Sequence, residues 1–171
     1  DEQRHDFQPE IWNVNSATPS MQQRWFPGVH SNVGGGLVKD GLANGALHWV
    51  AKEAQALGLE LNTDFLDYYR RYPCDEASNK SLFYQVSDAV YRPLRGFGGI
   101  RDLSRAPGMT LDDSVFTRLN ANREKHRRLA EPYRPKHLLE YLARNPQYDD
   151  KLEPQVLAEV FFEIFLGTRG F

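Results

Sequence analysis

The chain has 171 residues, of which 40% are apolar and 26% charged, and its net charge is −2. This length and apolar content suit a single domain or part of a larger one. A nucleic-acid-binding protein normally carries a large basic excess, so the near-neutral balance excludes the main argument for that class. No apolar run approaches the roughly 20 residues of a membrane-spanning helix. We therefore expect neither a nucleic-acid partner nor a transmembrane segment.

Cysteine and histidine content argues against a metal or disulfide framework. Cys74 is the only cysteine, which leaves no intrachain disulfide and no cysteine cluster for zinc or iron–sulfur. The histidines show no metal-ligand spacing, and H-E-x-x-H is absent. We predict no metal and no cofactor. Both ends of the chain are typical of cuts, since Asp1 is preceded by no Met or signal pattern and Phe171 follows an apolar stretch.

The first elements in chain order are a short strand, a glycine-rich loop and a long helix. Residues 22–26 are predicted as a strand that ends at Phe26, and residues 27–36 as a loop whose glycines allow positive φ or close backbone approach. The helix is predicted over residues 41–57, with Gly58 as a left-handed cap. Its apolar stripe comprises Leu42, Ala46, Leu47, Val50, Ala54 and Leu57.

A second, shorter helix is predicted over residues 64–71, with Thr63 as its cap. Residues 72–108 contain several prolines and glycines, which predict a long loop with at most short strands at 83–86 and 89–91. The packing residues of the second helix are predicted to be Phe65, Leu66, Tyr68 and Tyr69.

Three helices are predicted in the remainder of the chain. One begins near Leu111 with Thr110 in a capping-box-like start, one begins at Pro135, and an apolar one begins at Pro154. We expect the apolar region 154–171 to pack in the core or on sequence outside this chain, or alternatively to meet a lipid surface. The predicted inner faces are Val115, Phe116 and Leu119, then Leu138, Leu139 and Leu142, then Leu157, Val160, Phe161, Ile164 and Phe165.

His30 is the residue best placed for chemistry. It follows the predicted strand, and α/β folds hold catalytic groups outside the carboxyl ends of their strands. A histidine there can take a proton from a nucleophile and return it to a leaving group, because its ordinary pKa is near neutrality. It can also be a structural histidine in a tight turn. Similarly, Gly34–Gly36 can bring backbone N–H groups to an anion, although a turn is the commoner use of such glycines.

The segment Trp25–Gly36, WFPGVHSNVGGG, closely resembles the signature of a family of α/β hydrolases. This family includes the phospholipase effectors of the bacterial type VI secretion system, and its pattern reads Trp-Phe-Pro-Gly-x-His-Ser-Asp/Asn-Val-Gly-Gly-Gly. The resemblance extends over about residues 1–138. The flanking segments that carry it are residues 1–12, 41–50, 114–119 and 133–135.

The resemblance implies an α/β fold in which residues 1–171 form the C-terminal part of one α/β-hydrolase domain: its last sheet strand plus a mostly helical elaboration. It implies a serine ester hydrolase with a Ser-Asp-His triad, acting on a phospholipid or another lipid ester. By its place in the motif, His30 is the catalytic histidine, first a general base and then a general acid. The residues that support it are Gly28, Asn32, Gly34, Gly35 and Gly36.

The chain departs from the family at the nucleophile, because no serine stands in a G-x-S-x-G context. The resemblance therefore implies that the serine and the acid lie on the N-terminal part of the same domain, outside residues 1–171, and that the chain alone is inactive. The location stays open between the cytoplasm and delivery by a secretion system without a cleaved signal peptide. The alternative is a non-catalytic module that binds a partner protein or a membrane surface.

Overall fold

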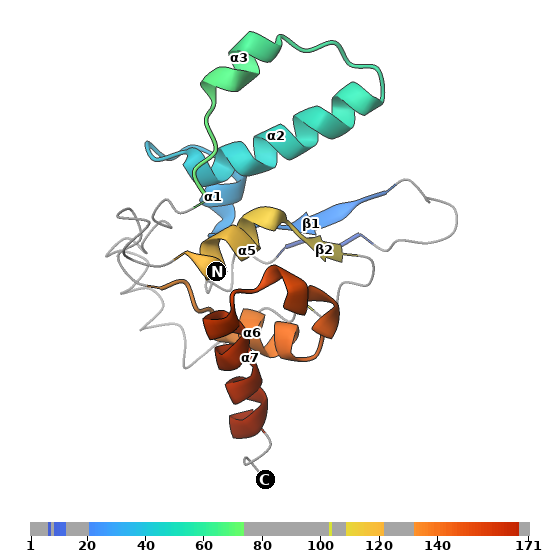
Figure 1. Ribbon diagram of the computed structural model, residues 1–171. Coiled ribbons are helices and arrows are strands. Elements are labelled where there is room, and N and C mark those ends of the chain that lie inside the picture. Colours follow the sequence, from blue (N-terminus) through green and yellow to red (C-terminus); the bar gives the residue numbers. More distant parts are fainter. Residues whose placement is uncertain are drawn as a thin grey trace, which may run out of the picture.

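The computed structural model describes residues 7, 9–12, 21–73, 103, 109–121 and 132–167, with side chains of the last segment described up to residue 162. Figure 1 shows helices α1, α2 and α3 on one side of a pair of short strands, and α6 and α7 on the other. The elements are β1 (Gln23–Trp25), α1 (His30–Gly34), α2 (Gly41–Ala56), α3 (Thr63–Tyr68), β2 (Met109–Leu111), α5 (Asp113–Asn120), α6 (Lys136–Ala143), the 3₁₀-helix η2 (Pro146–Lys151) and α7 (Pro154–Gly167).

The two described strands pair in parallel. Gln23 is opposite Met109 and Trp25 is opposite Leu111. Parallel strands require a long crossover, and α1, α2 and α3 lie in this one. The predicted strand at 22–26 is confirmed as β1, whereas β2 has no counterpart in the sequence-based prediction. The assignment of these strands to an α/β-hydrolase sheet stays a prediction.

Asp112 fixes the carboxyl end of β1 against the start of α5. Its backbone N–H donates to the Trp25 carbonyl at 2.9 Å, and its Oδ1 accepts from the Ser114 N–H at 2.9 Å, which caps the helix. Its Oδ2 accepts from Arg24 Nη1 at 3.3 Å. Through its backbone N–H and its carboxylate, Asp112 therefore links the end of β1 to the start of α5. This is the point where the chain leaves β1 towards His30.

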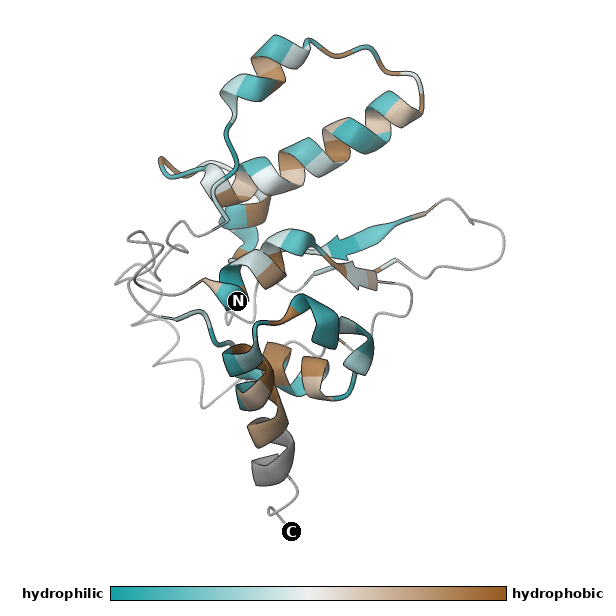
Figure 2. Ribbon diagram, in the orientation of Figure 1, coloured by the Kyte–Doolittle hydropathy of each residue, from teal (hydrophilic) through white to brown (hydrophobic). Residues whose placement is uncertain are grey.

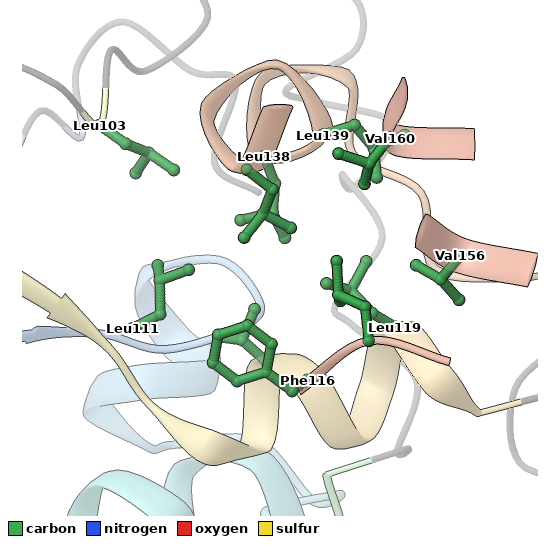
Figure 3. Close-up of a cluster of buried hydrophobic side chains, with 11 residues drawn as sticks. Leu103, Leu111, Phe116, Leu119, Leu138, Leu139, Val156 and Val160 are labelled. Carbon is green, nitrogen blue, oxygen red and sulfur yellow. The ribbon is translucent and has the colours of Figure 1, made fainter. Parts of the chain in front are cut away.

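The main hydrophobic core lies between β2, α5, α6 and α7, as Figure 3 shows. Leu119 and Leu142 are almost wholly removed from solvent. The predicted inner faces of α5 and α6 are confirmed, as is Val160 on α7. The buried members are Leu103, Leu111, Val115, Phe116, Leu119, Leu138, Leu139, Leu142, Leu152, Val156 and Val160.

The helix predicted near Leu111 begins later than expected. Met109–Leu111 pairs with β1 as a strand, so Thr110 cannot cap a helix, and Asp112 caps α5 instead. The cap of α3 is likewise Asn62 and not Thr63. Asn62 has the extended backbone of a cap, and its Oδ1 accepts from the Phe65 N–H at 3.0 Å.

The apolar stripe predicted for α2 is buried only near the start of the helix. The helix spans nearly the predicted range, and Gly58 follows it with φ 93°. Leu42 and Ala46 are buried, but Val50 is exposed and Leu57 is 90% exposed. Figure 2 shows apolar and polar residues alternating along the far half of α2. The C-terminal part of the stripe is therefore an exposed apolar surface that no other described residue covers.

The helices predicted from Pro135 and Pro154 are present as α6 and α7, but they differ from the prediction in detail. α6 begins at Lys136, with Pro135 as its N-cap. On α7, Val156 and Val160 enter the core, while Phe161 and Phe162 are exposed at 52% and 61%. The expectation that residues 154–171 pack on further sequence stays a prediction. Cys74 and the short strands at 83–86 and 89–91 lie outside the described residues.

Tyr133 makes part of the stability of the fold dependent on pH. Burial raises the pKa of Tyr133 above its usual value of 10.0, and the nearby Arg118 opposes this only partly. The folded chain therefore keeps a proton that the unfolded chain loses above pH 10, so the contribution of Tyr133 is complete below that pH and lost as the pH rises.

We predict that Tyr133→Phe flattens the decline in the free energy of unfolding above pH 10. Phenylalanine preserves the ring under the Arg118 guanidinium, whose carbon lies 4.8 Å from the ring centroid. The measurement is urea denaturation at a series of pH values from 8 to above 10. An unchanged slope in the variant would show that Tyr133 ionises equally in both states.

Candidate functional site

His30 is the first residue of α1, directly after the turn that leaves β1. Val29 is the N-cap, with φ −94° and ψ 176°, and Gly28 turns the chain with φ 109°. The prediction that residues 27–36 form a loop throughout is wrong, because His30–Gly34 form a five-residue helix. The turn therefore delivers the histidine from the carboxyl end of a strand to the start of a helix, where its side chain is exposed.

Asn32 holds this turn from inside. It is only 1% exposed, its Oδ1 accepts from the Val29 N–H at 3.0 Å, and its own N–H donates to the Val29 carbonyl at 2.8 Å. A residue at the third helical position that reaches back to the cap satisfies a backbone donor that the helix leaves unpaired. The acceptor oxygen occurs in asparagine and aspartate alike, which are the two residues that the motif admits here.

Gly28 and Asn32 require one another. A Cβ built on Gly28 would lie 2.5 Å from Asn32 Cβ and 2.9 Å from Asn32 Oδ1. No L side chain fits at that distance, and the positive φ of Gly28 also favours glycine. The glycine is therefore explained by close approach as well as by backbone conformation.

The triple glycine behaves as a turn in the described part of the chain. The Gly35 N–H donates to the Ser31 carbonyl at 3.0 Å, so it closes the end of α1. Gly35 and Gly36 have φ values of 90° and 93°. A Cβ built at Gly34, Gly35 or Gly36 would have no described atom within 4 Å beyond its chain neighbours and the backbone of α1. The geometry thus engages the Gly35 N–H within α1 and gives it no anion-binding role.

The imidazole of His30 is stacked against Phe7. The ring centroids lie 4.0 Å apart and the planes differ by 3°. Phe7 comes from the segment before β1, and sequence reasoning did not connect it with His30. Neither periodicity nor a motif spacing indicates such a contact, because the two rings are far apart in sequence.

Two other histidines are described, and they have different surroundings. His48 on α2 has Nε2 2.7 Å from the Tyr69 carbonyl oxygen, which ties the residues after α3 back to α2. His137 lines a cavity of about 30 Å³ together with Trp25 and Tyr133. That volume suits a water molecule and no larger ligand. His5 and His126 lie outside the described residues.

Neither a metal site nor a membrane span is found within the described ranges. No three histidine, cysteine, aspartate or glutamate side chains there are grouped to hold a metal ion. No helix in the same ranges has the length and apolar character needed to cross a bilayer.

Comparison with protein families extends this description. Residues 1–53 match the model of the type VI secretion (T6SS) phospholipase effector Tle1-like catalytic domain. The first third of the chain is therefore similar to the catalytic domain of a phospholipase effector. The matched residues include β1, α1, the Gly28–Asn32 turn, His30 and most of α2. Searches of curated proteins and of solved structures gave no match.

This match confirms the phospholipase-effector part of the resemblance seen in Trp25–Gly36. It covers about a third of the chain, and residues 54–171 lie beyond it. The α/β-hydrolase fold, the triad and the role of His30 remain predictions.

Proposed function

We propose that this chain supplies the catalytic histidine of a serine hydrolase that cleaves ester bonds in phospholipids. The observation that supports it most strongly is the match of residues 1–53 to a phospholipase catalytic domain, with His30 inside the matched segment. His30 is also exposed at the carboxyl end of β1, where α/β folds hold catalytic groups.

In this proposal His30 moves one proton in each half of the reaction. Its imidazole takes the proton of a serine hydroxyl as the oxygen attacks the ester carbonyl carbon. It returns that proton to the departing alcohol as the carbon–oxygen bond breaks, leaving an acyl-serine. A water molecule then repeats the sequence and releases the fatty acid. The Gly28–Asn32 turn keeps the imidazole at the strand end throughout.

In this proposal the serine of the triad comes from outside residues 1–171, because no G-x-S-x-G occurs in the chain. The acid, which follows the serine and precedes the histidine in α/β hydrolases, is proposed to come from outside as well. We propose that they lie on the N-terminal part of an α/β-hydrolase domain of which this chain is the C-terminal part. The described sheet has two strands, and its outer edges are paired with no described strand. An unpaired edge is a template for a further strand. The N-terminal part is thus a partner that can extend the sheet at an edge that no described strand occupies.

The test is hydrolysis of phosphatidylglycerol and phosphatidylcholine vesicles, read as released fatty acid. We expect activity from residues 1–171 joined to the N-terminal part that carries the serine, which we call the joined protein. We expect none from residues 1–171 alone. A fluorophosphonate, which reacts with activated serines, should label the joined protein only. If the joined protein neither releases fatty acid nor takes up the label, the proposal is wrong.

A second candidate function is binding without catalysis, to a partner protein or a membrane surface. It is favoured by Phe161 and Phe162, which are both more than half exposed. Phe162 also lines a groove of about 640 Å³ between α6 and α7, together with Lys136 and Gln155. An aromatic face beside a cationic side chain suits a lipid interface. Co-sedimentation of the joined protein with vesicles, without fatty-acid release or labelling, would favour this function over hydrolysis.

A further inference from the structure

Phe7 restricts the orientation of the side chain that the proposed function depends on. His30 is exposed, and an exposed side chain ordinarily samples several rotamers. The Phe7 ring lies parallel to the imidazole, with centroids 4.0 Å apart, so it covers one face and selects one ring plane. We propose that Phe7 is a positioning residue for His30, which rests on the proposed hydrolase function of that histidine.

Gln23 holds the segment that carries Phe7 beside β1. The Gln23 side chain donates from Nε2 to the Trp12 carbonyl at 2.8 Å and accepts at Oε1 from the Trp12 N–H, also at 2.8 Å. One carboxamide thus satisfies both backbone groups of Trp12, as a neighbouring strand would. The same strand leads into the turn that presents His30. Phe7 and His30 are therefore both anchored to β1, from opposite directions along the chain.

The contact should also stabilise the transition state of the proposed reaction. In the proposed mechanism the imidazole becomes an imidazolium when it takes the serine proton. A cation over the face of an aromatic ring is attracted by the ring quadrupole, and a neutral ring gains much less. The Phe7 contact therefore strengthens as the transition state forms, and such an interaction raises kcat without altering KM.

A structural readout tests the contact independently of activity. The ring current of Phe7 should shift the His30 imidazole protons upfield in the NMR spectrum of the 171-residue chain, with His30→Ala identifying the resonance. Phe7→Leu should move the resonance downfield, and Phe7→Trp should keep it upfield. Gln23→Leu should move it downfield by releasing the anchored segment. Trp12→Leu is the matched control, since it removes an exposed aromatic ring from the same segment and should leave the resonance in place.

The kinetic readout uses the joined protein. Phe7→Leu should lower kcat by about 2- to 30-fold at unchanged KM, and Phe7→Trp should restore it. The positioning role would be overturned if the His30 resonance did not shift in Phe7→Leu, or if that variant changed KM alone. If Phe7→Leu moves the resonance but His30→Ala retains activity, then the catalytic proposal fails and the positioning role fails with it, although the contact is real. If His30 is essential and the resonance does not respond, only the role of Phe7 is rejected.

Discussion

Replacing His30 by alanine is expected to lower kcat for phospholipid hydrolysis by roughly 10⁴- to 10⁶-fold in the joined protein. Without the imidazole, the serine hydroxyl keeps its proton and attacks as a weak nucleophile. The departing alcohol must also leave without a proton donor. The free energy of unfolding should change little, because the His30 side chain is exposed. The measurements are fatty-acid release from vesicles and urea denaturation of the same preparation.

His48→Ala is the matched control for this variant. His48 also lies on a helix within residues 1–53, but its Nε2 contacts the Tyr69 carbonyl. Losing that hydrogen bond should cost about 1 kcal/mol of stability and leave kcat unchanged. Wild-type kcat in His30→Ala, or equal losses in both variants, would show that His30 is not the general base.

Much of the helical structure could be predicted from local pattern. The apolar spacing from Leu42 onward and the glycine at position 58 defined α2 to within a residue or so of its observed ends. The leucines of α6 and the inner residues of α5 are buried as predicted. In α5 and α6 the apolar period and the tertiary packing agree, so nearby residues carry enough information. In α2 they agree only near the start of the helix, at Leu42 and Ala46.

β2 could not be predicted in the same way, because the strand with which it pairs is distant in sequence. Met109–Leu111 is only three residues long, and what makes it a strand is the parallel pairing with β1. Local pattern around Thr110 favoured a helix start, and the non-local hydrogen bonds outweighed it. Similarly, α1 is one turn long in a glycine-rich segment, and it forms because Asn32 caps it from the third position.

The candidate site likewise has one part that local sequence predicts and one part that depends on contacts between distant residues. His30 could be found from a contiguous motif, since Trp25–Gly36 carries it in twelve adjacent residues. The contact with Phe7 and the anchoring of Trp12 by Gln23 could not, because each joins residues far apart through a single side chain. The sequence also left open whether the glycines serve packing or turns. The structure distinguishes the two roles. A Cβ on Gly28 would clash with Asn32, whereas a Cβ on Gly34 would contact nothing beyond its chain neighbours and its own helix backbone.

The second large effect is expected from Gly28→Ala, which should lower the free energy of unfolding by about 2–6 kcal/mol. The positive φ of Gly28 accounts for about 1–3 kcal/mol of this, and the contact of the new Cβ with Asn32 for about as much again. Asn32 can relieve the contact only by moving, which breaks its bond to the Val29 N–H and displaces His30. Urea denaturation and kcat of the joined protein measure the two consequences.

Gly34→Ala is the control for this substitution. Gly34 ends α1 without a positive φ, and a Cβ there meets no described atom. Alanine should leave stability unchanged or raise it by up to about 1 kcal/mol, since alanine is the better helix former. Equal stability of Gly28→Ala and Gly34→Ala would mean that the turn does not depend on the approach of Gly28 to Asn32. His30→Ala should lower kcat at nearly constant stability, whereas Gly28→Ala should lower both. The comparison of these two variants therefore separates the chemical role of the histidine from the role of the turn that positions it.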